Sequence, residues 1–287
     1  MKSIRQQQDR VDTLKGFFNL IESYEEIAAI RMRKVRMVVL QNREYLEGIN
    51  EIYGLVASVY ETYLSKISRK KIIQNKVRPN NGKTVSIFLS SNIGLYGDVI
   101  RKSLDLFVKE TQDKKSDIVI VGRLGRDWYK NLPSHKKFTY FEFSDSGIDR
   151  PSLEAILKHI LKYKEIEVYH GIFRNILAQV PKRTSITGDL SKYKEKEVEK
   201  TLEKVLFEPS VGAVMAFFEE QILSIFFDQV VNESSLSKFA SRMINLDFAV
   251  ARIDKQIEKA NLTLKKMKHT KLNKDQLSVL SGITLWK

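Results

Sequence analysis

The chain has 287 residues and a formal net charge of +14, with 43% hydrophobic and 29% charged residues. This hydrophobic share is large enough for a packed core and excludes a wholly disordered protein, and the length suggests about two structural units of roughly 150 residues. Because the sequence contains no cysteine, disulfide scaffolds, thiolate metal sites and cysteine nucleophiles are excluded.

The first ten residues are polar and charged, so we expect no secretory signal. No apolar run reaches the roughly 18–20 residues that span a bilayer, which predicts a soluble, cytoplasmic protein. The basic surface predicts an acidic partner. The charge alone does not decide whether this partner is nucleic acid, anionic lipid or an acidic protein.

Residues 1–78 are predicted to form one long helix, because apolar residues recur at steps of three and four and no proline precedes Pro79. The expected seam is Leu14, Phe17, Ile21, Tyr24, Ala28, Met32, Val35, Val39, Asn42, Leu46, Ile49, Tyr53, Val56, Tyr60, Tyr63 and Ile67. Two consecutive steps of four, ending at Met32, predict a stutter that locally unwinds a supercoil. At about 1.5 Å per residue, residues 14–67 would extend about 80 Å. Several shorter helices in a bundle are the alternative.

Residues 79–207 change to the pattern of an α/β domain. Strands are expected at 84–90, 117–121, 137–143 and 165–170, and helices at 99–110 and 151–163. Alternating strands and helices predict a largely parallel, Rossmann-like sheet. Residues 193–204 are expected to be a solvated linker or hairpin.

Residues 208–287 are predicted to form a second long helix, with Pro209 suited to its first turn. Its expected seam is Met215, Phe218, Ile222, Ile225, Gln229, Asn232, Leu236, Phe239, Met243, Leu246, Val250, Ile253, Ile257, Ala260, Leu264 and Met267. The two terminal helices can bury their seams on each other, which predicts an antiparallel coiled coil around the α/β domain. Homodimeric coiled coils are the alternative.

Catalytic motifs are missing from the sequence. No GxxxxGK[ST] phosphate loop or complete GxGxxG occurs, and the pairs Gly94/Gly97 and Gly122/Gly125 are better explained by tight strand-to-helix turns. The four histidines show no metal-ligand spacing. Asp145 is interpreted, like Asp149, as a solvated turn acid. We therefore expect no enzymatic site, metal or cofactor, and a mechanical or binding role.

Basic residues form three clusters. The first is Arg31, Arg33, Lys34 and Arg36; the second is Lys255, Lys259, Lys265, Lys266 and Lys268; the third is Lys66, Arg69, Lys70, Lys71, Lys76 and Arg78. If the terminal helices are antiparallel, the first two clusters can form one basic girdle. For each cluster, a solvated face is the alternative.

Several motifs resemble the gamma subunit of rotary F-type ATP synthases. Residues 207–210 read FEPS, and residues 91–97, Ser-Asn-Ile-Gly-Leu-Tyr-Gly, stand where that family has S-D-R-G-L-C-G. Gly122-Arg123 resembles its G-R-K-G. Further matches are Arg10-Val11, residues 27–33, Ser237, Ala240, Arg242, Met243, Leu246 and residues 280–282. The family's Asp-Arg is replaced by Asn92-Ile93, the Glu after its Ser by Lys238, and its R-Q by Lys268-His269.

This resemblance implies a divergent, non-catalytic rotor shaft that turns inside a hexameric ring of alpha and beta subunits, with catalysis on beta. It implies that acidic loops of the ring meet Arg31, Arg33, Lys34, Arg36, Arg242, Lys255, Lys259, Lys265, Lys266, Lys268 and His269. An epsilon-like or other stalk subunit is the expected further partner, nucleic acid is not expected, and the complex would lie on the inner face of the cell membrane. A related ATPase of a bacterial gliding motor is a further possibility. A basic coiled-coil scaffold or nucleic-acid-binding protein is the competing class, and a dinucleotide-dependent enzyme is a third.

Overall fold

The computed structural model describes residues 3–67, 80–145, 149–187, 208 and 210–284, and side chains within these ranges except at 50–67, 211, 215 and 282–284. The chain divides into two units, one of Met1–Ile30 with Arg242–Lys287 and one of Arg31–Ser241. The predicted domain boundaries at 78/79 and 207/208, the linker at 193–204, Pro209 and most of the third basic cluster involve residues outside the described ranges.

Two long helices, α1 (Ile4–Ile67) and α6 (Val211–Thr284), pass through both units. In the first unit, the Gln7 side-chain amide donates to the carbonyl of Ala260 at 3.1 Å, and the Arg242 guanidinium lies 5.7 Å from the centre of the Tyr24 ring. Residue numbers rise on α1 while they fall on α6, so the helices are antiparallel there, as predicted.

The second unit repeats this antiparallel pairing. The Asn42 amide donates to a carboxylate oxygen of Asp228 at 3.0 Å, and the Arg31 guanidinium lies 5.9 Å from the centre of the Phe239 ring. Pairing within one chain confirms the predicted coiled coil of the two termini.

The seam of α1 differs from the predicted one near its start. Four residues beside the seam, Gln8, Ala29, Arg31 and Val38, are also half-buried. The seam itself runs through the buried or half-buried residues Ile4, Gln7, Val11, Leu14, Phe18, Ile21, Glu25, Ala28, Met32, Val35, Val39, Asn42, Leu46 and Ile49. These alternate strictly in steps of three and four, so the predicted stutter at Met32 is wrong. Phe17 and Tyr24, at 52% and 43% exposed, lie beside the seam that Phe18 and Glu25 occupy. The predicted seam of α6 is confirmed at every position with a described side chain.

The central sheet has five strands in the order β3-β2-β1-β4-β5. Its strands are β1 (Thr84–Leu89), β2 (Ser116–Val121), β3 (Phe138–Phe141), β4 (Glu165–Phe173) and β5 (Gln179–Ser185). The first four are parallel and β5 pairs antiparallel with β4, which confirms the predicted largely parallel α/β domain. The associated helices are α2 (Val99–Thr111), α3 (Arg123–Lys130) and α4 (Arg150–Ile160).

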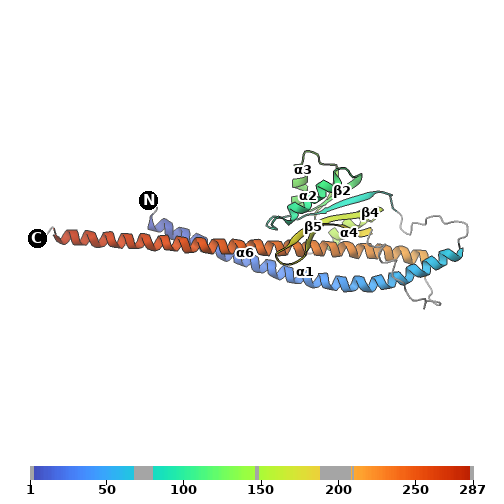
Figure 1. The fold of residues 1–287 in the computed structure, drawn as a ribbon, viewed down its shortest axis with the longest axis horizontal. Helices are drawn as coiled ribbons and strands as arrows, with labels where there is room; N and C mark the ends of the chain where they lie inside the picture. Colours follow the sequence, from blue (N-terminus) through green and yellow to red (C-terminus); the bar gives the residue numbers. More distant parts are fainter. Residues whose placement is uncertain (1–2, 68–79, 146–148, 188–207, 209, 285–287) are drawn as a thin grey trace. The chain divides into compact units, whose positions relative to one another are not determined.

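The two faces of the sheet are covered differently, as Figure 1 shows. Alternate strand residues such as Val85, Ile87 and Val168 belong to a core cluster with apolar residues of α4 and α6. On the other face, beside α2 and α3, Phe107 stacks on Phe88 with ring centres 5.5 Å apart and meets the edge of Tyr169. The helix α6 is thus both a partner of α1 and a layer of the α/β domain.

This double role explains how α6 is buried. None of residues 222–244 is exposed, although exposed residues recur along the rest of α6. A helix that is covered on all sides needs apolar or paired side chains all round. Ile222, Leu223 and Phe227 accordingly face the sheet core, while Leu236 and Phe239 continue the heptad seam.

Tight turns account for one glycine of each predicted pair, Gly97 and Gly122, whereas Gly125 lies inside α3. Gly122 has φ +100° and Gly97 has φ +61°, a region that favours glycine. Gly125 needs to be small, because a Cβ there would lie 2.5 Å from the Cβ of Ser90.

We expect Gly125→Ala to lower the free energy of unfolding by about 1–3 kcal/mol, because the added methyl group would force α3 away from β1. Gly94→Ala is the matched control, since a Cβ at Gly94 meets nothing within 4 Å. Urea unfolding of both variants measures the difference. A Gly125→Ala variant as stable as Gly94→Ala would show that α3 can shift without cost.

Candidate functional site

The first basic cluster lies on the part of α1 that belongs to the second unit. Arg33, Lys34 and Arg36 are exposed and lie off the seam. Arg31 is half-buried, and its guanidinium is used within the chain by the ring of Phe239. Three of the four cations therefore face outward.

The second basic cluster lies on the part of α6 that belongs to the first unit. Lys255, Lys259, Lys265, Lys266, Lys268 and His269 are all exposed. Arg242, by contrast, is only 9% exposed, and its guanidinium stacks on Tyr24. Because the two clusters belong to different units, the single girdle stays a prediction.

The C-terminal part of α6 is exposed on every side. All residues from 268 to 281 are exposed, and they include the apolar side chains of Leu272, Leu277 and Leu280. A helix stretch of this length without tertiary packing is marginally stable in water. This composition is typical of a segment that a partner covers.

The interpretation of Asp145 as a solvated turn acid is wrong. Its side chain is 10% exposed, and its Oδ2 accepts hydrogen bonds from the backbone N–H groups of Asn92, at 2.7 Å, and Ile93, at 2.9 Å. It is therefore a buried anchor for the loop after β1 and not a solvated acid. Asp149 is exposed, as predicted, and accepts a hydrogen bond from the hydroxyl of Ser152.

Lys238 is the functional candidate that the sequence did not single out as a site. Its side chain is 12% exposed, its ammonium donates to the carbonyl of Ser90 at 2.9 Å, and it lies 3.9 Å from Oδ1 of Asp145. Burial lowers the pKa of Lys238, and the charge of Asp145 opposes this shift. The signal in the sequence was Lys238 at a position where the resembled family has Glu. The structure places this reversal of charge on a buried stretch of α6.

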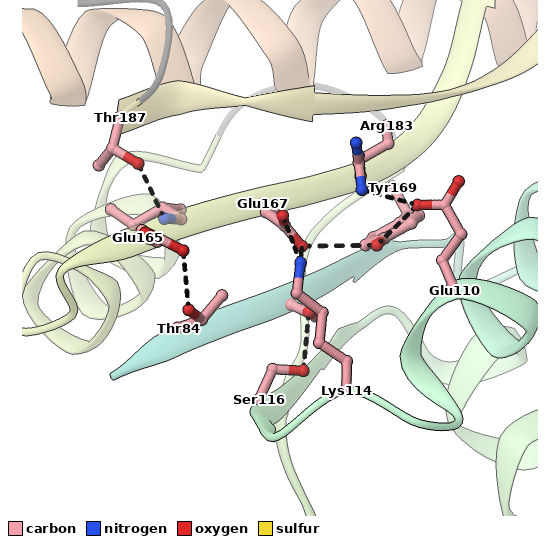
Figure 2. A network of polar contacts seen from close by, with 11 residues as sticks. Thr84, Glu110, Lys114, Ser116, Glu165, Glu167, Tyr169, Arg183 and Thr187 are labelled. Carbon is pink, nitrogen blue, oxygen red and sulfur yellow. Dashed lines mark hydrogen bonds and ion pairs between the residues drawn. The ribbon is translucent and has the colours of Figure 1, made fainter. Parts of the chain in front are cut away.

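A second polar cluster lies on the α2 side of the sheet, near β4 and β5 (Figure 2). Lys114 pairs with Glu167, the Tyr169 hydroxyl donates to Glu110 at 3.2 Å, and Arg183 pairs with Glu110 at 3.1 Å. Burial and the neighbouring carboxylates raise the pKa of Tyr169, which keeps it a hydrogen-bond donor. Since each of these charges is paired, the cluster stabilises the strand edge and offers no free acid or base.

Within the part of the chain that the structure describes, no three His, Cys, Asp or Glu residues come together as metal ligands. No helix in the same part is both long and apolar enough to cross a bilayer.

The family model described as ATP synthase matches residues 3–284. An ATP synthase gamma chain of Protochlamydia amoebophila is 20% identical, with 98% of each chain covered. Among solved structures, a chain in the rotor of the Euglena gracilis mitochondrial ATP synthase matches with a TM-score of 0.56 at 12% identity, covering 94% of this chain and 98% of that one. A chain in the central stalk and c-ring of the Tetrahymena thermophila enzyme matches with a TM-score of 0.53 at 18% identity, covering 80% and 99%.

The family match therefore agrees with the motifs and with the fold of two long helices around a five-stranded sheet. The chain belongs to the ATP synthase family as a divergent gamma chain, the non-catalytic central-stalk subunit of a rotary F-type ATPase.

Proposed function

We propose that this chain turns inside a ring of alpha and beta subunits and contacts it through exposed basic residues of α1 and α6. The observation that carries this proposal is the outward position of Arg33, Lys34 and Arg36 and of the lysines between Lys255 and Lys268. None of these cations is joined by an ion pair to another residue that the structure describes. They remain available for carboxylates of a partner, where charge-assisted bonds are strongest.

The two partly buried arginines have a different place in the proposal. Arg31 and Arg242 each stack on a ring supplied by the opposite helix, Phe239 and Tyr24 respectively. Such contacts contribute about 0.5–2 kcal/mol each. We propose that Arg31 and Arg242 mainly hold α1 and α6 together, next to the residues that contact the alpha and beta subunits. The exposed His269 lies on the surface proposed for the ring.

The proposed mechanism is differential contact. An asymmetric shaft presents different side chains to each beta subunit, so it favours a different conformation in each one. Rotation then changes which subunit is open or closed, and this couples ATP turnover to rotation. The charges of α1 and α6 supply the contacts that differ around the shaft.

The remaining partners follow from the same proposal. We propose that an epsilon-like or other stalk subunit joins this chain to machinery at the membrane, and that the complex is peripheral on the inner, cytoplasmic face. Rotation would drive proton transport or another device such as a gliding motor. ATP-driven acidification of membrane vesicles that hold the complex is the expected result for proton transport, and its absence during ATP hydrolysis would favour the other output.

Charge reversal tests the proposed ring contact. We expect Arg33→Glu with Lys266→Glu to lower the torque or rotation-coupled ATPase activity of the assembled complex at least about tenfold, because each acidic partner would meet a like charge. The free energy of unfolding of the chain should change by only about 0.5 kcal/mol, since both side chains are exposed and off the seam.

Lys137→Glu with Lys158→Glu is the matched control, because it makes the same change in net charge at exposed positions of the α/β domain. The control should keep its activity. Equal activity of both double variants in assembled complexes would contradict the proposed contact, and equal loss of folding and activity would show that Arg33 and Lys266 are structural.

A further inference from the structure

One turn of α6 makes three different contacts with the α/β domain. The ammonium of Lys238 donates to the carbonyl of Ser90, directly after β1, and the hydroxyl of Ser241 donates to the carbonyl of Tyr96 at 2.8 Å. Ser237 lies so close to β4 that a Cβ on Gly171 would be 2.9 Å from its hydroxyl oxygen. These contacts fix the position of α6 along its axis and its rotation about that axis, relative to the α/β domain.

Lys238 is the charged member of this turn, and besides the carbonyl of Ser90 it approaches one carboxylate. A buried ammonium costs several kcal/mol unless it is paired and hydrogen-bonded. Asp145 is the carboxylate whose charge acts on Lys238, at 3.9 Å. The pair is therefore stable only when the loop that carries Asp145 and the helix that carries Lys238 stay together.

Asp145 also connects Lys238 to the loops that follow the parallel strands. Its other oxygen accepts the N–H groups of Asn92 and Ile93, and the Asn92 amide donates to the carbonyl of Phe143 at 2.7 Å. The Asn92 side-chain oxygen accepts the N–H of Arg123, at the start of α3, at 3.0 Å. We call Ser90, Asn92, Asp145 and Lys238 the carboxyl-end junction, because they meet where the parallel strands β1 and β3 end.

Three departures from the motifs of the resembled family meet at this junction. Those motifs carry Asp at the position of Asn92, Arg at the position of Ile93 and Glu at the position of Lys238. Here the N–H of Ile93 and the ammonium of Lys238 approach the same carboxylate, that of Asp145. The loop therefore lacks the Arg of the motif, while the helix carries a cation where the motif has Glu.

We propose that Lys238 is a positioning residue that locks α6 to the α/β domain through Asp145, so that torque passes between the helix pair and the domain. Apolar packing of α6 on the sheet resists separation but sets rotation weakly, because it is non-directional. A buried, hydrogen-bonded charge pair sets one register. This inference rests on the proposed rotation of the chain.

The first test uses the full chain alone and does not depend on rotation. We expect Lys238→Met to raise the amide hydrogen exchange of Asn92 and Ile93 about tenfold, because Asp145 loses its cation and holds the loop less firmly. Lys238→Arg should keep the protection, since it retains the charge. Lys102→Met is the control, because it removes a lysine from an exposed ion pair with Asp98 on α2. Unchanged exchange in Lys238→Met would contradict the junction.

The second test uses the chain assembled with its ring. The chain has no cysteine, so Lys109→Cys on the exposed surface of α2 gives one attachment point for a bead on the α/β domain. We expect Lys238→Met to lower the torque delivered to the bead at least about twofold while the ATPase activity of the ring stays, and Lys238→Arg to restore the torque. The double variant Lys238→Met with Asp145→Asn removes both charges, so it avoids an unpaired buried carboxylate and should lose no more torque than Lys238→Met.

The outcomes separate the two proposals. Rotation of the unaltered chain with equal torque in Lys238→Met would contradict the role of Lys238 alone. A bead that does not rotate even with the unaltered chain would contradict the proposed function, while the hydrogen-exchange result would still decide whether the junction exists.

Discussion

Phe227→Ala is expected to lower the free energy of unfolding by about 3–5 kcal/mol. Phe227 is fully buried in the core cluster formed by β1, β2, β4, α4 and α6, so its removal leaves a cavity between the sheet and the long helix. The effect should be large because this helix has no exposed side along residues 222–244 from which the cavity could be filled.

Phe217→Ala is the matched control for this prediction. It makes the same change on the same helix at a side chain that is 59% exposed, so we expect a loss below about 1 kcal/mol. Urea unfolding followed by circular dichroism measures both. Equal losses would show that the contact of α6 with the sheet contributes little to stability.

A histidine buried in β4 is expected to make the chain sensitive to acid. Burial lowers the pKa of His170 from 6.5 to about 4, and a hydrogen bond to the carbonyl of Gly171 opposes the shift only in part. The ring nitrogen Nδ1 donates to that carbonyl, and Nε2 accepts from the hydroxyl of Thr184 at 3.0 Å, so the neutral ring is fully satisfied.

The direction of the pH effect follows from linkage. Above pH 6.5 the ring is neutral in both states, and its full contribution to stability is present. As the pH falls from 6.5 to about 4, the unfolded chain takes up a proton that the folded chain refuses, so stability falls. The shift corresponds to about 3 kcal/mol, at about 1.4 kcal/mol per pKa unit.

We therefore expect the free energy of unfolding to depend less steeply on pH in His170→Gln than in the unaltered chain. The difference in slope should approach 1.4 kcal/mol per pH unit, about the limit for one proton. His135→Gln is the control, because His135 is exposed. Identical pH dependence of His170→Gln and the unaltered chain would show that His170 is protonated in the folded state at its usual pKa.

The elements with strong periodicity were predictable from the sequence. The heptads of both long helices and the four parallel strands follow directly from apolar spacing, and the structure places them within a few residues of the expected bounds. The strand β5 was missed because its sequence, with Pro181 and two basic residues, lacks the pattern of a buried strand. It forms because an edge position next to β4 tolerates proline.

The residues of α1 that occupy the seam were less predictable. Phe17 and Tyr24 are more apolar than Glu25, yet Glu25 occupies the seam, and burial and nearby carboxylates raise its pKa. Which of two adjacent residues occupies the seam depends on the side chains of the partner helix, such as Arg242, whose guanidinium lies over the ring of Tyr24 beside the seam. Sequence spacing alone does not contain this information.

The candidate site was only partly predictable for a similar reason. The exposed lysines of α6 could be found from their run in the sequence, because a helix that has little to pack against leaves its charges outside. The burial of Lys238 and Asp145 depends on a contact between residues 93 positions apart in the chain. Only the departures from the family motif at Asn92, Ile93 and Lys238 marked this place in advance.

The subunit stoichiometry of the complex purified through a tag on this chain tests the central claim most directly. A central-stalk gamma chain should bring down two nucleotide-binding subunits, with three copies of each for every copy of the tagged chain. Recovery of the chain alone, as a homodimer or with nucleic acid in place of such a ring would contradict the account.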